Sequence, residues 1–176
     1  MSTTSYKKIN NLWVGVAMVL SLVVILGYFY ISVLNKKPII IGFVAKLTGS
    51  QAELGVQERN GVQLAVENVN ATGGIAGHKI KLIIRDDLGT NDKSQVIDRE
   101  LVKDGVIAII GHSTSTQTLS GLKVTNPAKV LMIGPTIDTP ELSGLKDYFF
   151  RVCPSFKDSA QAFTKYIYKK DNIKRL

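Results

Sequence analysis

Two short segments rich in hydroxyl groups, His112–Thr116 and Thr136–Thr139, hold the residues best suited to bind a small molecule. Each follows an apolar run, Val106–Ile110 before the first and Lys129–Ile133 before the second. Such runs, rich in β-branched residues, are typical of strands covered on both faces. The first segment also opens a helix, whose free N–H groups favour an anion, and the second contains Asp138, which favours a cation. These two turns predict a ligand that carries both charges, such as an amino acid.

An enzymatic alternative comes from the same region. The run Gly111–Ser115, GHSTS, is similar to the G-x-S-x-G nucleophile elbow of α/β hydrolases, with Ser113 in the place of the nucleophile. Its fifth residue is serine instead of glycine, and no histidine follows His112, as a Ser-Asp-His order would require. The α/β hydrolase is therefore a minor alternative, and we expect a protein without catalytic activity.

Cofactor motifs are missing from the sequence. The glycine-rich run Gly73–Gly77 follows a helical segment and precedes a strand, so it is not a dinucleotide fingerprint, and there is no P-loop. A single cysteine, Cys153, excludes an internal disulfide and a cysteine-based zinc site. We expect neither a cofactor nor a metal.

The elements that position the two turns alternate along the chain. Further strands are expected at Ile39–Ala45, Lys79–Arg85 and Tyr148–Val152, with helical segments between successive strands and a last helix from Ser155. Strands joined through helices run parallel. The sequence predicts an α/β fold with a doubly wound parallel sheet, in which ligands bind beyond the carboxyl ends of the strands.

The segment Leu12–Leu34 carries no charged residue. At about 1.5 Å per residue, a helix of this length crosses the roughly 30 Å hydrocarbon core of a bilayer. A cleaved signal peptide is the alternative, but its apolar region is shorter and is followed by a small-x-small cleavage site, which Tyr28–Asn35 lacks. We expect an uncleaved single-pass anchor over 12–34, with residues 1–11 in the cytoplasm and 35–38 as a linker.

The basic character of the chain, with a formal net charge of +8, does not indicate a nucleic-acid partner. Four of the 22 basic residues flank the apolar segment, whereas all 14 acidic residues follow it. The basic residues near the end of the chain are typical of a solvated helix face, and no aromatic-plus-basic motif accompanies them.

A set of short motifs, in one order and at nearly one spacing, resembles the type I periplasmic binding proteins, in particular their leucine/isoleucine/valine-binding branch. The matching stretches are Leu47-Thr48-Gly49, Ala65–Asn70, Gly73–Gly77, Asp86-Asp87, Ile109–His112, Leu131–Pro135 and Pro140–Leu142. The resemblance covers about Ile39 to Leu176 and implies one lobe of a receptor that closes on its ligand.

The resemblance also implies a set of ligand-binding residues. The serine that binds the ligand's α-carboxylate falls on Ser115, with Thr116 beside it. The backbone carbonyl that accepts from the α-ammonium falls on Thr136, and Asp138 stands where the family has a threonine. Leu54 stands where the family places an aromatic residue over the ligand side chain.

The family's second lobe begins about where Asn172–Leu176 ends the sequence, so we interpret residues 39–176 as an N-terminal ligand-binding lobe truncated at the start of the second. The resemblance implies an extracytoplasmic receptor for a small amino-acid-like ligand, in the periplasm or outside the cell. Such a receptor delivers its ligand to the permease of an ABC-type amino acid transporter. The alternative is a membrane-anchored sensory input domain of a signalling receptor.

Overall fold

The computed structural model describes residues 3–34 and 36–170. Its elements in chain order are α1 (Thr3–Leu34), β1 (Ile39–Ala45), α2 (Glu53–Ala71), β2 (Ile80–Asp86), α3 (Asn91–Lys103), β3 (Ala108–Gly111), α4 (Ser115–Thr125), β4 (Leu131–Gly134), a 3-10 turn η1 (Pro140–Leu142), β5 (Phe149–Arg151) and α5 (Phe156–Lys170).

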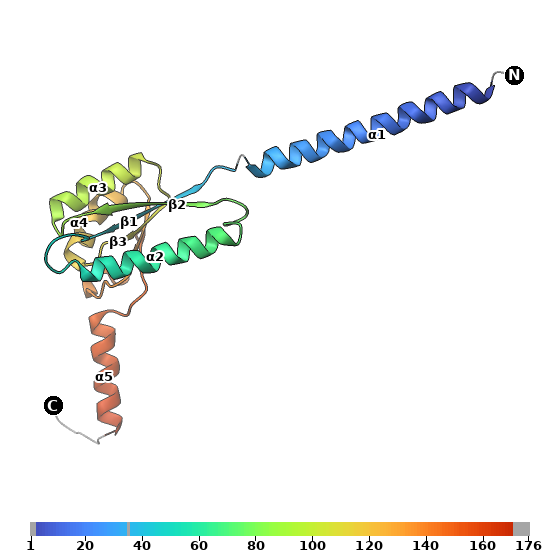
Figure 1. Ribbon diagram of the computed structural model, residues 1–176. Helices are drawn as coiled ribbons and strands as arrows, with labels where there is room; N and C mark the ends of the chain where they lie inside the picture. Colours follow the sequence, from blue (N-terminus) through green and yellow to red (C-terminus); the bar gives the residue numbers. More distant parts are fainter. Residues whose placement is uncertain (1–2, 35, 171–176) are drawn as a thin grey trace.

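The five strands form one sheet in the order β2-β1-β3-β4-β5, and each neighbouring pair is parallel. Ile41 in the inner strand β1 pairs with Leu82 of β2 on one side and with Ala108 of β3 on the other. Helix α2 covers one face, over β1 and β2, while α3 and α4 lie on the opposite face (Figure 1). The predicted doubly wound α/β fold is confirmed.

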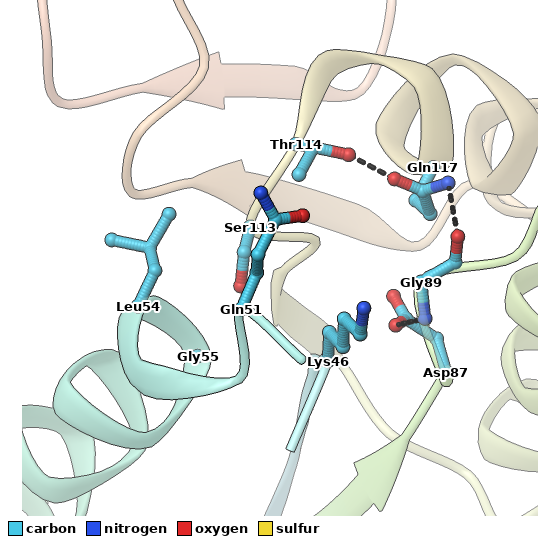
Figure 2. A pocket seen from close by; sticks show the side chains of 9 residues that line it. All are labelled: Lys46, Gln51, Leu54, Gly55, Asp87, Gly89, Ser113, Thr114 and Gln117. Carbon is cyan, nitrogen blue, oxygen red and sulfur yellow. Dashed lines mark hydrogen bonds between the residues drawn. The ribbon is translucent and has the colours of Figure 1, made fainter. Parts of the chain in front are cut away.

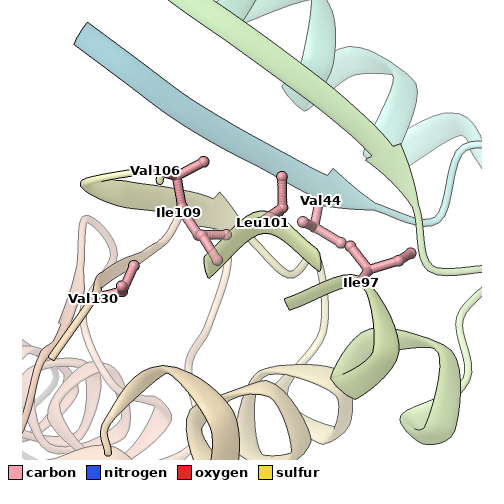
Figure 3. Packing of buried hydrophobic residues seen from close by; sticks show 6 residues of the cluster. All are labelled: Val44, Ile97, Leu101, Val106, Ile109 and Val130. Carbon is pink, nitrogen blue, oxygen red and sulfur yellow. The ribbon is translucent and has the colours of Figure 1, made fainter. Parts of the chain in front are cut away.

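The main core lies between the sheet and the helices α3 and α4. Val44 of β1 and Ile109 of β3, both fully buried, pack with Ile97 and Leu101 of α3 (Figure 3). At Gly42 an added Cβ would come within 2.9 Å of Leu101, so this glycine lets the helix approach the strand closely. A second buried cluster continues under α4 and consists of Leu122, Met132, Ile137, Leu142 and Phe149.

Two strands begin later than the sequence predicts. The predicted strands Val106–Ile110 and Lys129–Ile133 are β3 and β4, which start at Ala108 and Leu131. In both cases one of the first predicted residues closes the preceding helix instead. The N–H of Val106 donates to the carbonyl of Leu101, and that of Val130 to the carbonyl of Thr125. An apolar run alone does not separate the residues that close a helix from those that open the next strand.

The remaining strands agree with the prediction to within one residue. β1 is found at the predicted Ile39–Ala45, β2 lies one residue beyond the predicted Lys79–Arg85, and β5 is one residue shorter at each end than Tyr148–Val152. The side-chain amide of Asn70 explains where β2 begins, because it bonds both the N–H and the carbonyl of Ile80. This contact ties the end of α2 to the start of β2.

The apolar segment forms most of α1, within which Trp13–Ile31 is long and apolar enough to cross a membrane, with a mean hydropathy of 2.4. In Figure 1 this helix projects away from the sheet, and its described side chains are largely exposed. A signal sequence near the N-terminus meets the same criteria of length and composition. Of the predicted linker, Asn35 lies outside the described residues, while the Lys36 ammonium donates to the carbonyl of Ala76.

Helix α5 begins with a side-chain cap at Ser155, where the sequence predicts the helix to start. The Ser155 hydroxyl accepts from the N–H of Asp158 and donates to its carboxylate, which lowers the pKa of Asp158. No residue of α5 is buried, and Phe156 and Phe163 are 68% and 65% exposed. The predicted end of the lobe, Asn172–Leu176, lies outside the described residues.

Candidate ligand-binding site

The turns that follow β1, β2 and β3 enclose a cavity of about 420 Å³ at the carboxyl edge of the sheet. This is the edge where open parallel sheets bind ligands. Figure 2 shows the Lys46 side chain reaching toward this space, with Leu54 at one side of it and Gln117 at another. The lining residues are Lys46, Gln51, Leu54, Gly55, Asp87, Gly89, Ser113, Thr114 and Gln117.

Two glycines allow the turns to meet. A Cβ at Gly55 would overlap the carbonyl oxygen of Lys46, so the first turn of α2 can lie against the end of β1 only with glycine there. Gly111 has a φ of 134°, and a Cβ there would overlap the carbonyl oxygen of Val44. Both positions require glycine because of the close approach, and Gly111 requires it for its backbone conformation as well.

Helix α4 presents its N-terminus to the cavity wall. Its N-cap residue Thr114 has extended backbone, and its side chain makes no capping bond to a backbone N–H. Instead, the Thr114 hydroxyl bonds to the side chain of Gln117, whose amide donates to Gly89 O and Asn91 Oδ1. The uncapped N–H groups of this first turn provide a partial positive charge next to the cavity.

Glu58 of α2 joins the two predicted binding turns. The Ser113 hydroxyl donates to Glu58 Oε2 at 2.5 Å, and Thr136 Oγ1 lies 2.8 Å from Glu58 Oε1. Thr136 Oγ1 also lies 2.8 Å from the Ser113 carbonyl oxygen, so its single proton is shared between two acceptors. Sequence reasoning missed Glu58, although its position four residues after Leu54 places both on one face of a helix.

The residues predicted from the sequence are spread around this edge of the sheet. Leu54 lines the cavity and is 46% exposed. Ser115 is the half-buried first residue of α4, directly after the cavity-lining Thr114, and Thr116 is exposed. Thr136 is joined to Ser113 as described above. Asp138 is exposed, and its backbone carbonyl accepts from the N–H of Phe156. Its carboxylate makes no hydrogen bond or ion pair within the described part of the chain.

At the start of the turn after β3, His112 is fully buried between two carboxylates. Its Nδ1 lies 2.6 Å from Asp87 Oδ2 and its Nε2 lies 3.2 Å from Asp98 Oδ2. Burial lowers the pKa of His112, but the hydrogen bonds to Asp87 and Asp98 outweigh it and raise the pKa to about 9. Sequence reasoning missed this cluster, although Asp98 shares a helix face with Ile97 and Leu101, an unusual position for a carboxylate.

The two aspartates at the end of β2 have separate structural roles. Asp86 accepts from the N–H groups of Leu47 and Leu88 and from the Thr48 hydroxyl. Burial raises the pKa of Asp86, but these bonds and the nearby Lys46 ammonium lower it by more, so the net shift is downward. Asp87 accepts from the N–H of Gly89 and pairs with His112. They organise the turn after β2, as their position at the strand end indicates.

The hydrolase alternative finds no geometric support here. Ser113 donates to Glu58, whereas both ring nitrogens of His112 face Asp87 and Asp98. The serine and the histidine of the elbow-like motif are therefore not bonded to each other within the described structure, as a nucleophile and its base would be.

The family model described as "periplasmic binding protein" matches residues 38–176. Leu/Ile/Val-binding protein BraC3 from Rhizobium johnstonii is 35% identical over 140 residues, and the Leu/Ile/Val-binding protein from Escherichia coli K12 is 31% identical over 138 residues. These alignments cover 78% and 77% of this chain but only 38% and 37% of the relatives. The chain belongs to the periplasmic binding protein family and corresponds to part of its relatives' length.

Solved structures agree with this assignment. A structure of the branched-chain amino acid transporter substrate-binding protein LivJ from Streptococcus pneumoniae, in complex with isoleucine, is 31% identical with a TM-score of 0.68. A substrate-binding protein from Desulfitobacterium hafniense, in complex with Leu, is 26% identical with a TM-score of 0.68. Each match covers 77% of this chain and 39% of that structure. The resemblance to the leucine/isoleucine/valine-binding branch is confirmed.

Proposed function

We propose that this chain forms the N-terminal ligand-binding lobe of an extracytoplasmic receptor for a small amino-acid-like ligand. The observation that carries the proposal is the convergence of polar groups from four strand-end turns on one edge of the sheet. The cavity receives the Lys46 ammonium and the N-terminus of α4, whereas Glu58 and Asp138 supply carboxylates at the same edge. Groups of both signs suit a ligand with a carboxylate and an ammonium.

The ligands of the related structures support a carboxylate as the common feature. Two of these proteins were solved with isoleucine and with leucine. A third, a solute-binding protein of an ABC transporter from Rhodopseudomonas palustris, was solved with 3,4-dihydroxybenzoic acid and is 26% identical with a TM-score of 0.64. This match covers 76% of this chain and 36% of that structure. We place the carboxylate at Ser115 and Thr116, and the ammonium near the Thr136 carbonyl and Asp138, with Leu54 against the ligand side chain.

The partner that fits this function is the permease of an ABC-type amino acid transporter. Two structural relatives support it: one is the substrate-binding protein of a branched-chain amino acid transporter, and the other is a solute-binding protein of an ABC transporter. The apolar helix α1 supports a single-pass anchor that holds the lobe at the outer face of the cytoplasmic membrane. The same helix favours a second candidate function, a membrane-anchored sensory input domain. Detection of the mature protein in washed membranes, with α1 present in its mass spectrum, would support the anchor; a mature protein that lacks α1 would exclude it.

Binding is tested on the full chain in detergent micelles, because one lobe that buries one face of a ligand binds weakly. Backbone amide signals are followed by NMR during titration with leucine, isoleucine and valine. We expect saturable shifts at Ser115 and Thr116, and loss of binding in Ser115→Ala. Ser159→Ala is the matched control, since it changes an exposed serine in the first turn of α5. Equal affinity in the two variants would remove Ser115 from the site.

A further inference from the structure

His112 connects three elements from a position that solvent does not reach. Its ring is bonded to Asp87 at the end of β2 and to Asp98 in α3, and the residue itself lies directly after β3. All three side chains are nearly or fully buried. An ionised carboxylate only accepts hydrogen bonds, so both ring nitrogens donate if both aspartates are ionised, and the ring is then an imidazolium.

The packing around this cluster leaves no room for a side chain at Gly121 of α4. A Cβ at Gly121 of α4 would overlap the Asp98 carboxylate and come within 2.8 Å of His112 Nε2. Asp98 Oδ1 is buried without a hydrogen-bond partner in the described structure. Within that structure, the charged groups that act on His112 are Asp87, directly after β2, and Asp98 of α3, while α4 contributes the uncharged Gly121. The attraction between ring and carboxylates is therefore weakly screened.

The cluster is also continuous with the candidate site. Ser113 is the residue after His112. Its hydroxyl donates to Glu58, and its carbonyl accepts from the Thr136 hydroxyl. On the other side of the ring, Asp87 lines the cavity and orders the turn after β2 through the N–H of Gly89. The position of His112 consequently sets where both turns lie at the cavity.

We infer that His112 is a positioning residue, whose imidazolium is held between Asp87 and Asp98 and fixes the turn Ser113–Ser115 at the cavity. The effect on ligand affinity rests on the proposed function, whereas the ordering of the turn does not. The ring of His112 touches no part of the cavity directly and acts through the backbone of Ser113 and through Asp87.

This arrangement makes the turn dependent on one proton. Burial opposes the charged ring, but the two carboxylates hold the pKa of His112 at about 9. When the pH rises through this value, the neutral ring keeps one N–H and loses its second donor contact. One carboxylate is then left buried beside an acceptor nitrogen, so the turn should loosen at alkaline pH and be ordered at neutral pH.

The test follows the amide signals of Ser113 and Thr114 by NMR between pH 6 and 10, on the full chain in micelles. For the unaltered protein we expect a transition centred near pH 9, matched by the ring nitrogen shifts of His112. Asp98→Asn should abolish this transition or lower its midpoint by at least about one pH unit, because the asparagine amide donates to the Nε2 of a neutral ring. Asp104→Asn, at the exposed end of the same helix, is the control and should leave the midpoint unchanged.

Two results would overturn the inference. One is a ring of His112 that is neutral at pH 7 while the turn is ordered, which would place the proton on Asp98 instead. The other is an unchanged midpoint in Asp98→Asn. Leucine affinity is measured on the same samples at pH 7 and pH 10. Failure to bind at either pH would count against the proposed function alone, because the transition of the turn is read without ligand.

Discussion

Glu58 Oε1 and Thr136 Oγ1 lie 2.8 Å apart although the two residues are 78 positions apart in the chain. The same carboxylate accepts from Ser113, so one residue of α2 holds the turns after β3 and β4 together. Hydrogen bonds to a charged group contribute about 1.5–3 kcal/mol each. The edge that we propose to bind the ligand is therefore braced before any ligand arrives.

Removal of this brace gives the first prediction. Glu58→Ala should lower the free energy of unfolding by about 1–3 kcal/mol, because the Ser113 hydroxyl loses its acceptor and Thr136 loses one of its two acceptors. Chemical denaturation of the full chain in micelles measures the effect. Glu67→Ala, at an exposed site of the same helix, is the control and should change stability by less than about 0.5 kcal/mol. Equal losses in the two variants would show that the brace contributes nothing.

A second prediction concerns the glycine that ends β3. Gly111→Ala should destabilise the fold by more than about 2 kcal/mol, because φ is 134° and the new Cβ would overlap the carbonyl oxygen of Val44. Gly61→Ala, on the exposed face of α2 with no atom within 4 Å of the new Cβ, should stabilise by up to about 1 kcal/mol. Opposite shifts in melting temperature are expected, and a neutral Gly111→Ala would contradict the close approach of β1 and β3.

The sequence predicts the sheet well because a strand buried on both faces needs a continuous apolar run, and Ile39–Ala45 is found where it is predicted. It also places the hydroxyl-rich turns correctly at the carboxyl edge. It does not predict that Glu58 and Thr136 meet, since that contact depends on how α2 crosses the sheet. The contact of Asp98 with His112 is missed because it also depends on how a helix packs on the sheet. A carboxylate within an apolar helix face indicates a buried partner but does not identify His112 as that partner.

The dependence of global stability on pH provides a third prediction. The pKa of His112 is about 9 in the folded state against 6.5 for the ordinary residue. Its contribution, on the order of 3 kcal/mol, is fully present below pH 6.5 and is lost as the pH rises through 9, because the folded state binds the proton more tightly. Denaturation at pH 6, 8 and 10 should show this decline. In Asp98→Asn the decline should be much smaller, whereas an equal decline would assign it to other groups.

A fourth prediction concerns Asp86 at low pH. Its pKa lies below the ordinary value of 3.8, since the hydrogen bonds from Leu47, Thr48 and Leu88 and the Lys46 charge outweigh the effect of burial. This carboxylate therefore contributes stability above pH 3.8 that is lost as the pH falls through its folded-state pKa. Asp86→Asn should lower the free energy of unfolding at pH 6. At pH 2 the variant and the unaltered protein should differ less in this free energy than they do at pH 6. A constant difference at both pH values would contradict this assignment.

The last prediction separates charge from shape in the cavity. The Lys46 ammonium lines the cavity and makes no hydrogen bond or ion pair within the described part of the chain, although its charge acts on nearby Asp86. It can therefore meet an anionic ligand group. Lys46→Met keeps most of the side-chain length and removes the charge, and should weaken leucine binding by about 1–3 kcal/mol. Leucinamide, which lacks the carboxylate, should bind both forms equally. The control Lys81→Met removes an exposed charge from β2 and should leave leucine binding unchanged. If Lys46→Met weakens leucine and leucinamide alike, the side chain shapes the cavity and does not bind the carboxylate.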